Sequence, residues 1–252
     1  MERILIFAGT TEGRKLAEYL KDFPVKTYLS VATEYGRESL DDSDYEVIIG
    51  RKNEGEIAAF LEIRNITKVI DATHPFAQLA TKNIKAACDQ KNVPYIRCLR
   101  EHQKMDYQDN RQIIRVDSIA TAVEYLKHTE GRIFVATGSK DLKLYTAIDN
   151  YRERCYARVL STEDAVKESI RLGFEGRHLI AMQGPYSREL NVALLRHIGA
   201  SYFVTKESGK TGGFEEKLEA AEDTEVKFIV IGRPEEEGLT FEEVCELLKK
   251  TL

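Results

Sequence analysis

Short apolar runs alternate along the whole chain with segments whose apolar residues recur at helical spacing. The run Arg3–Ala8 predicts a buried strand, and Thr11–Lys21 predicts a helix with Leu16, Ala17 and Leu20 on one face. The same pattern predicts strands over Val25–Val31, Tyr45–Ile49, Lys68–Ala72 and Pro94–Leu99, and helices over Glu54–Ile63 and His74–Gln90.

A polar stretch without periodicity, residues 100–110, interrupts this alternation and marks a domain boundary. We therefore expect two domains, residues 1–105 and residues 106–252. The later strands are expected over Gln112–Val116, Arg132–Thr137, Cys155–Val159, His178–Met182, Tyr202–Thr205 and Val226–Ile231. The later helices are expected over Ser118–Lys127, Thr162–Leu172, Ser187–His197, Phe214–Glu222 and Phe241–Lys250, with Ser118 as an N-cap and Gly199 at a helix end. Because strands alternate with helices, each domain is expected to be a doubly wound α/β fold with a mainly parallel sheet.

Ligands of such folds bind beyond the carboxyl ends of the strands, so the turns that follow the strands are the candidate sites. The first turn carries Gly9, Thr10, Thr11 and Glu12. Glycine allows the backbone to approach a pyrophosphate closely, and the amides and hydroxyls of Thr10 and Thr11 can donate to it at a helix N-terminus. The turn lacks the full G-x-G-x-x-G pattern, and the alternative is an ordinary turn with a threonine N-cap.

The second strand is followed by the region in which dinucleotide folds recognise the adenosine ribose. Glu34 would accept a hydrogen bond from a free 2′-hydroxyl, which favours NADH. Ser30, Thr33 and Arg37 would instead hold a 2′-phosphate, which favours NADPH. The alternative is that Glu34 and Arg37 are solvated loop charges.

The fourth strand ends in Asp71 and is followed by Thr73, His74 and Pro75. Pro75 suits the first position of a helix, where its missing N–H costs little. Thr73 and His74 lie where a cofactor would bind, and His74 is also a candidate proton donor. The alternative is that Thr73 caps a helix and His74 is merely exposed.

Turns of the second half carry polar residues that suit an anionic ligand: Ser139, Lys140 and Asp141, then Gln183, Tyr186 and Ser187, then Lys206 and Ser208. Ser139 can cap a helix, and Lys140 can hold a carboxylate or a phosphate. Asp141 could donate a proton if a bound polyanion kept it protonated. For each turn, the alternative is a loop with solvated charges.

Composition narrows the class of protein. The net charge is −5 and no segment is strongly basic, which argues against a nucleic-acid partner. No apolar run approaches the roughly 18 residues that span a bilayer, and no signal-peptide pattern is present, so we expect a cytoplasmic protein without a membrane partner. The four cysteines form no C-x-x-C pair, so we expect idle thiols and no metal site.

The turn motifs, taken in order, resemble those of one family. They fall at Gly9–Glu12, Ala72–Ala77, Thr137–Leu142, Met182–Ser187, Thr205–Gly209 and Gly232–Pro234. This ordered set resembles the precorrin-6A and cobalt-precorrin-6A reductases of corrin biosynthesis, and Ala72–Ala77 is its most specific member. The family often shows Gly-Gly-Thr-x-Glu-Ala at the first turn, where this chain has Ala8 and Gly13, which puts the tightness of that turn in doubt.

The resemblance implies two Rossmann-like domains, the first binding NADH or NADPH and the second binding a tetrapyrrole-derived macrocycle. It implies that a hydride passes from the nicotinamide to one ring carbon and a proton to its neighbour. From its place after a strand of the second domain, Asp141 is the first candidate for the proton donor, and His74 is the second. Basic and hydroxyl side chains of the second-domain loops would bind the acetate and propionate groups of the macrocycle. Any cobalt would arrive inside the substrate.

Two other functions stay open. One is a different NAD(P)-dependent reductase on the same fold, and the other is a module that senses the cofactor without turnover. The sequence does not decide between NADH and NADPH, between a metal-free and a cobalt-containing substrate, or which face of the macrocycle receives the hydride. It does not determine the oligomeric state, for which a monomer or a weak dimer is the expectation.

Overall fold

The computed structural model describes residues 1–32, 45–99, 112–208 and 212–252. The chain divides into two compact units, the first formed by Met1–His102 with Pro234–Leu252 and the second by Gln103–Arg233. Both units are doubly wound α/β folds with parallel sheets, as the alternation of strands and helices predicts.

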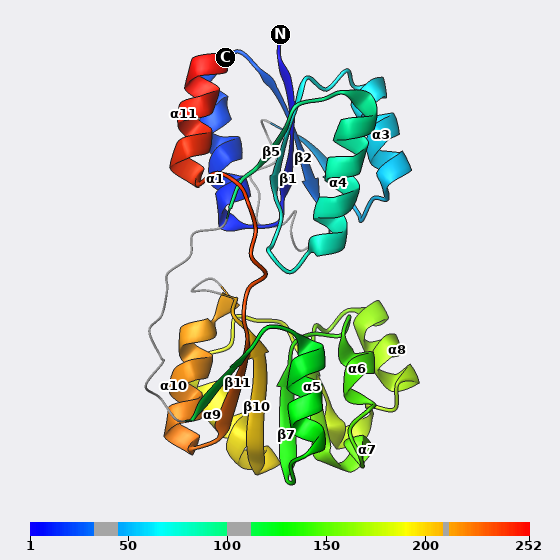
Figure 1. The fold of residues 1–252 in the computed structure, drawn as a ribbon, viewed down its shortest axis with the longest axis vertical. Coiled ribbons are helices and arrows are strands. Elements are labelled where there is room, and N and C mark those ends of the chain that lie inside the picture. The colour runs from blue at the N-terminus through cyan, green and yellow to red at the C-terminus, as the bar shows by residue number, and fades with distance from the viewer. Residues whose placement is uncertain (33–44, 100–111, 209–211) are drawn as a thin grey trace. The chain divides into compact units, whose positions relative to one another are not determined.

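The sheet of the first unit has five strands in the order β3-β2-β1-β4-β5, and all its pairings are parallel. Its strands are β1 (Arg3–Ala8), β2 (Lys26–Val31), β3 (Glu46–Ile49), β4 (Lys68–Ala72) and β5 (Tyr95–Arg97). Its helices are α1 (Thr11–Tyr19), the short η1 (Leu20–Asp22), α3 (Glu54–Ile63), α4 (Gln78–Lys91) and α11 (Phe241–Thr251). Helices α1 and α11 cover one face of the sheet, and α3 and α4 cover the other (Figure 1).

The last helix corrects the predicted domain boundary, because it belongs to the first unit and not to the second. Val244 and Leu248 of α11 are fully buried and pack in the same core as Leu16 and Leu20 of α1 and Ile70 of β4. Without α11, part of this apolar face would be exposed to water. The chain therefore leaves the first unit, forms the second, and returns.

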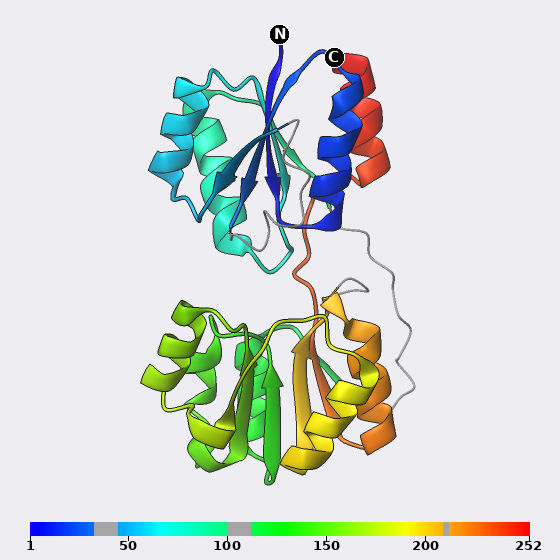
Figure 2. The same ribbon diagram turned by 180° about the vertical axis from the view of Figure 1, so that it is seen from behind.

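The sheet of the second unit has six strands in the order β6-β11-β10-β7-β8-β9, again all parallel. Its strands are β6 (Ile113–Val116), β7 (Arg132–Ala136), β8 (Cys155–Val159), β9 (Leu179–Ala181), β10 (Ala200–Lys206) and β11 (Lys227–Ile231). Its helices are α5 (Ile119–Lys127), α6 (Leu142–Tyr145), α7 (Tyr151–Arg154), α8 (Glu163–Arg171), the short η3 (Gly176–His178), α9 (Arg188–Ile198) and α10 (Phe214–Thr224). Helices α9 and α10 cover one face and α5 and α6 the other (Figure 2).

Most predicted helix ends are confirmed. The Ser118 side chain caps α5 by accepting from Thr121 N, and Gly199 ends α9 in the left-handed region at φ 62°. The start of α4 is different: the helix begins at Gln78 and not at His74, and Pro75 lies in the preceding turn. The residue before a proline is biased away from helical geometry, which explains the later start. Ser139 does not cap α6 with its side chain, because Asp141 occupies the N-cap position.

Gly13 allows α1 to lie closely against the sheet. A Cβ atom at this position would lie 2.8 Å from the Cα of Ala8 and 3.2 Å from the Cβ of Ala72. Gly13 therefore acts as the third glycine of a dinucleotide-binding turn does, since that glycine permits close packing of helix and strand. The first turn is tight although Ala8 stands where the family often has glycine.

We predict that Gly13→Ala destabilises the protein, whereas Gly55→Ala does not. Overpacking against Ala8 should cost about 1–3 kcal/mol, more than the roughly 1 kcal/mol that alanine gains over glycine in a helix. Gly55 lies in α3, where a Cβ would meet only Asn53 Oδ1 at 3.5 Å, so alanine should leave stability unchanged or raise it slightly. Thermal unfolding of the two variants measures both effects. Equal melting temperatures would show that α1 is not held by this contact.

Candidate functional site

The candidate cofactor-binding turns of the first unit meet at one point of the sheet. The strand order reverses between β1 and β4, and ligands of doubly wound folds bind beyond the carboxyl ends of the strands at such a point. The hydroxyl of Thr10, after β1, donates to the carbonyl of Ala72 in β4 at 2.9 Å. A Cβ on Gly9 would lie 3.4 Å from the Cα of Thr73. The structure thus brings the first turn against the turn that carries Thr73 and His74.

The first turn holds polar atoms that no described residue satisfies. Thr10 is the N-cap of α1, and its hydroxyl accepts from Gly13 N at 3.3 Å. The hydroxyl of Thr11 and Oε2 of Glu12 are buried and lack a hydrogen-bond partner, while Gly9 is exposed. Leaving buried polar atoms unpaired is costly, which is the condition expected where a ligand completes the hydrogen bonding. The residues therefore fit a bound nucleotide.

His74 lies in the turn after β4 and is half-buried. Its Nδ1 accepts from the backbone N–H of Phe76 at 3.3 Å, and the two rings stack with centroids 5.6 Å apart. The hydrogen bond to Nδ1 leaves the neutral ring protonated on Nε2. The ring is thereby held at the carboxyl edge of the sheet.

A buried ion pair lies beneath this turn, and its cation, Arg97, is not among the site residues predicted from the sequence. Arg97 of β5 donates to Oδ1 of Asp71 at 3.0 Å, and the two side chains are 5% and 0% exposed. Arg97 also donates to the carbonyl of Thr73 at 3.1 Å and to Glu236 at 2.7 Å, and the hydroxyl of Tyr95 donates to Asp71 at 2.9 Å. The pair fixes the backbone at Thr73 and joins it to the segment with which the chain returns to the first unit, Pro234–Leu252. An arginine within an otherwise apolar run was the one signal for it in the sequence.

Of the remaining predicted cofactor residues, Ser30 lies within the described ranges and the other three do not. Ser30 lies in β2, one residue before its end, and is buried. Thr33, Glu34 and Arg37 fall in residues 33–44, outside the described residues. Their part in ribose recognition stays a prediction.

The second unit brings together two of its predicted turns. The strand order reverses between β7 and β10, whose carboxyl ends lie beside each other. Lys206, the last residue of β10, donates to Oδ2 of Asp141, after β7, at 2.8 Å. Lys140 is exposed beside Asp141, and Ser208 donates to the carbonyl of Gly212 at 3.1 Å. Ser139 is half-buried in the same turn as Asp141.

The loop after β9 carries the other predicted substrate residues. Gln183 is exposed, and the Ser187 side chain caps α9 by accepting from Leu190 N at 3.3 Å. The Tyr186 hydroxyl donates to the carbonyl of Met182 at 2.7 Å, and its ring lies 3.8 Å from the guanidinium of Arg158. Arg158, on β8, is buried and is not among the site residues predicted from the sequence.

The thiols are poor candidates for catalysis. Burial raises the pKa of Cys88, Cys98 and Cys155 to about 12, so these groups stay protonated near neutral pH. Burial also raises the pKa of Cys245. Within the described ranges, no cluster of three or more His, Cys, Asp or Glu side chains could hold a metal ion. No helix in those ranges combines the length and the apolar character that a bilayer crossing requires.

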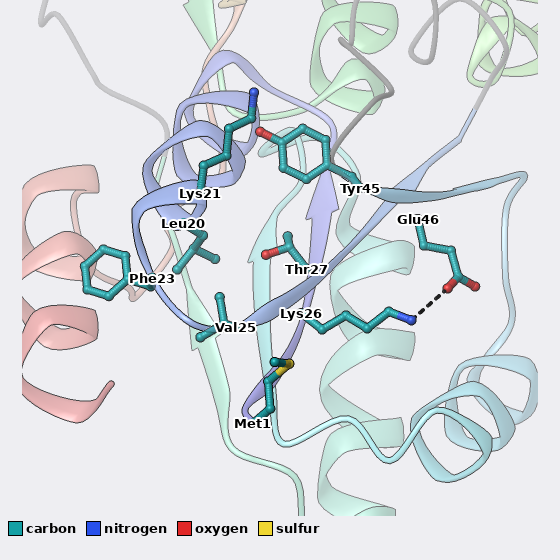
Figure 3. Close-up of a pocket in the computed structure, with 9 residues that line it drawn as sticks. All are labelled: Met1, Leu20, Lys21, Phe23, Val25, Lys26, Thr27, Tyr45 and Glu46. Atoms are coloured by element: carbon teal, nitrogen blue, oxygen red, sulfur yellow. Dashed lines mark ion pairs between the residues drawn. The ribbon is translucent and has the colours of Figure 1, made fainter.

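A hollow of about 470 Å³ lies in the first unit (Figure 3). It is lined by residues at the amino edge of the sheet, including Met1, Lys26 and Thr27, together with Leu20, Tyr45 and Glu46. Lys26 begins β2, so the hollow lies at the opposite edge from the turns described above. None of the predicted site residues lines it.

Comparison with known proteins agrees with this geometry. The family model described as precorrin-6x reductase CbiJ/CobK matches residues 3–251. A cobalt-precorrin-6A reductase of Priestia megaterium is 35% identical over 97% of this chain and 97% of its own length, and one of Salmonella typhimurium is 32% identical over 92% and 87%. The solved structure of a CobK precorrin-6A reductase superposes with a TM-score of 0.74 at 26% identity, covering 99% of this chain and 97% of the other. The chain belongs to the precorrin-6x reductase (CbiJ/CobK) family, as its ordered turn motifs predict.

Proposed function

We propose that this chain reduces one double bond of a corrin-precursor macrocycle, precorrin-6A or cobalt-precorrin-6A, with NADH or NADPH as the hydride donor. The observation that carries the proposal is the meeting of the family's first two motifs, where Thr10 donates to the carbonyl of Ala72 at the point of reversed strand order. Relatives named cobalt-precorrin-6A reductase favour the cobalt-containing substrate.

The cofactor, when bound, supplies the hydride, and the protein orients it. Gly9 leaves the backbone open, and the N-terminus of α1 directs N–H groups and a partial positive charge towards a pyrophosphate. The unpartnered hydroxyl of Thr11 suits a phosphate oxygen, and the unpartnered carboxylate oxygen of Glu12 suits a hydroxyl of the ribose. Thr73 and His74, in the turn that follows the neighbouring strand β4, lie beside Gly9.

The proton would come from Asp141 or from His74. Asp141 accepts a hydrogen bond from the ammonium of Lys206 at 2.8 Å, and the two side chains form an ion pair. As the donor, Asp141 would have to carry a proton when the macrocycle is bound. His74 needs no such change, because its reference pKa lies near neutrality. The ammonium of Lys206, positioned by Asp141, also suits binding of a carboxylate of the substrate.

The chemical assay for this function uses the purified protein, NADH or NADPH, and a precorrin-6A preparation with or without cobalt. We expect cofactor oxidation only when the macrocycle is present, and kcat/KM slightly higher with NADH than with NADPH because Glu34 would repel a 2′-phosphate. Cofactor binding without turnover of either macrocycle would instead identify a sensor. Turnover of an unrelated substrate alone would identify a different reductase on the same fold.

We predict that Gly9→Val weakens nicotinamide binding about 10- to 100-fold, the effect of losing one hydrogen bond to a charged group. A branched side chain at this exposed position would keep the pyrophosphate from the backbone. The matched control is Gly55→Val, at an exposed position of α3 away from the turn. Titration of cofactor fluorescence gives the affinities, and melting temperatures show that both variants fold. Unchanged affinity in Gly9→Val would remove this turn from the cofactor site.

We predict that Asp141→Asn lowers kcat by at least about 100-fold, the usual minimum for loss of a general acid, and leaves cofactor affinity nearly intact. Asp149→Asn, the same change at an exposed position of the second unit, serves as the control. Steady-state kinetics of Asp141→Asn and His74→Ala decide between the two donors. If only His74→Ala is impaired, the histidine is the donor. If both variants turn over normally, water supplies the proton.

A further inference from the structure

Two cations are buried in the second unit, and neither forms an ion pair with a carboxylate among the residues that the structure describes. Arg158 of β8 is 4% exposed, and Lys217 in the first half of α10 is 6% exposed. Within the described ranges, Arg158 makes one side-chain hydrogen bond, to Oδ1 of Asn191 at 2.8 Å, and Lys217 makes one, to the carbonyl of Gly212 at 2.7 Å. Both acceptors are neutral, so in the described part of the chain neither cation makes an ion pair.

The surroundings fix Arg158 at the carboxyl edge of the sheet. Its guanidinium lies 3.8 Å from the ring centroid of Tyr186 and 5.0 Å from that of Phe134, and such contacts hold its plane. Asn191 donates to the carbonyls of Tyr186 and Ser187, which attaches the loop after β9 to the same cluster. A guanidinium has five N–H donors, and the Asn191 bond uses only one of them. Within the described ranges no hydrogen bond uses the other four, so a bound anion would be able to accept from them.

The two charges also oppose each other. Burial lowers the pKa of Arg158 to about 10. Burial and then the charge of Arg158 lower the pKa of Lys217 to about 8, while the carboxylate of Glu216 acts in the opposite direction. Oε2 of Glu216 is itself buried and has no hydrogen-bond partner among the residues described here. Burying like charges together is costly, and the single carboxylate of Glu216 offsets only part of this cost, so a bound anion would stabilise the cluster.

We propose that Arg158 and Lys217 form a subsite for one carboxylate arm of the macrocycle, an acetate or a propionate group. The proposal rests on the proposed function and adds two residues to it that no turn motif contains. A planar guanidinium matches a carboxylate through two parallel hydrogen bonds, and the ammonium of Lys217 supplies a second charge. The N-terminal half of α10, which carries Lys217, adds a partial positive charge of the same sense. The subsite binds the arm, and it takes no part in the hydride or proton transfer.

The test compares Lys217→Met and Arg158→Met with Arg171→Met, which removes an exposed arginine of α8 and changes the net charge equally. In the reductase assay, we expect KM for the macrocycle to rise at least about 30-fold in the first two variants, as for loss of one member of a buried charge pair. The kcat value and the KM for the nicotinamide should change little, because the interaction is present in both ground and transition states. Arg158→Lys should recover part of the loss.

Melting temperature distinguishes this role from a structural one. Replacing an uncompensated buried cation by methionine should leave the melting temperature unchanged or raise it. A lower melting temperature with an unchanged KM would show that the cations only support the fold, and would overturn the subsite.

Binding of a porphyrin octacarboxylate, followed by its absorbance, separates this proposal from the proposed function. If the unmodified protein turns over neither macrocycle but binds the porphyrin about 30-fold more tightly than Lys217→Met does, the subsite stands and the reaction does not. Equal binding by both proteins overturns the subsite. A protein that neither reacts with the macrocycle nor binds the porphyrin overturns both proposals.

Discussion

The buried ion pair between Asp71 and Arg97 is the interaction on which the candidate cofactor site depends. Removing two charges from water is expensive, and here the geometry offsets the cost, because Asp71 also accepts from Tyr95 and from the backbone N–H of Thr73. The same guanidinium reaches the carbonyl of Thr73 and the carboxylate of Glu236. One cation therefore ties the end of β4, the strand β5 and the returning segment into a single rigid edge. His74 follows directly on this edge.

The close approach of α1 supplies the other half of the site. Gly13 allows the helix to touch Ala8 and Ala72, and this contact places the N-terminus of α1 beside the turn after β4. The turn lacks two of the glycines in the usual dinucleotide pattern. Instead, the hydroxyl of Thr10 donates a hydrogen bond to the carbonyl of Ala72 and holds the turn against β4. This hydrogen bond fixes the distance between the turn after β1 and the end of β4, which a glycine at this position, having no side chain, would not do.

The fold class, the two-unit arrangement and the adjacency of the motif turns were predictable, because apolar periodicity and the carboxyl-edge rule depend on local sequence. The position of α11 was not. Its apolar stripe shows that it covers a sheet, but either sheet would satisfy that pattern, and the choice depends on packing against Leu16 and Leu20. Arg97 and Arg158 were missed for a related reason. Each lies inside a strand, where a charged residue is normally taken for a solvent-facing one, and only the tertiary structure shows that both are buried.

The two buried arginines illustrate how the same residue type serves opposite purposes. Arg97 has a carboxylate on each side that neutralises its charge, so its burial stabilises one backbone conformation. Arg158 has an amide and two aromatic rings and shares its surroundings with Lys217, so its charge is held in place but not neutralised. Such an arrangement does not increase the stability of the fold, because burying apolar residues of similar size would cost less free energy than burying these charges. The difference in pairing, and not in burial, is what separates the structural cation of the first unit from the anion-binding cation of the second.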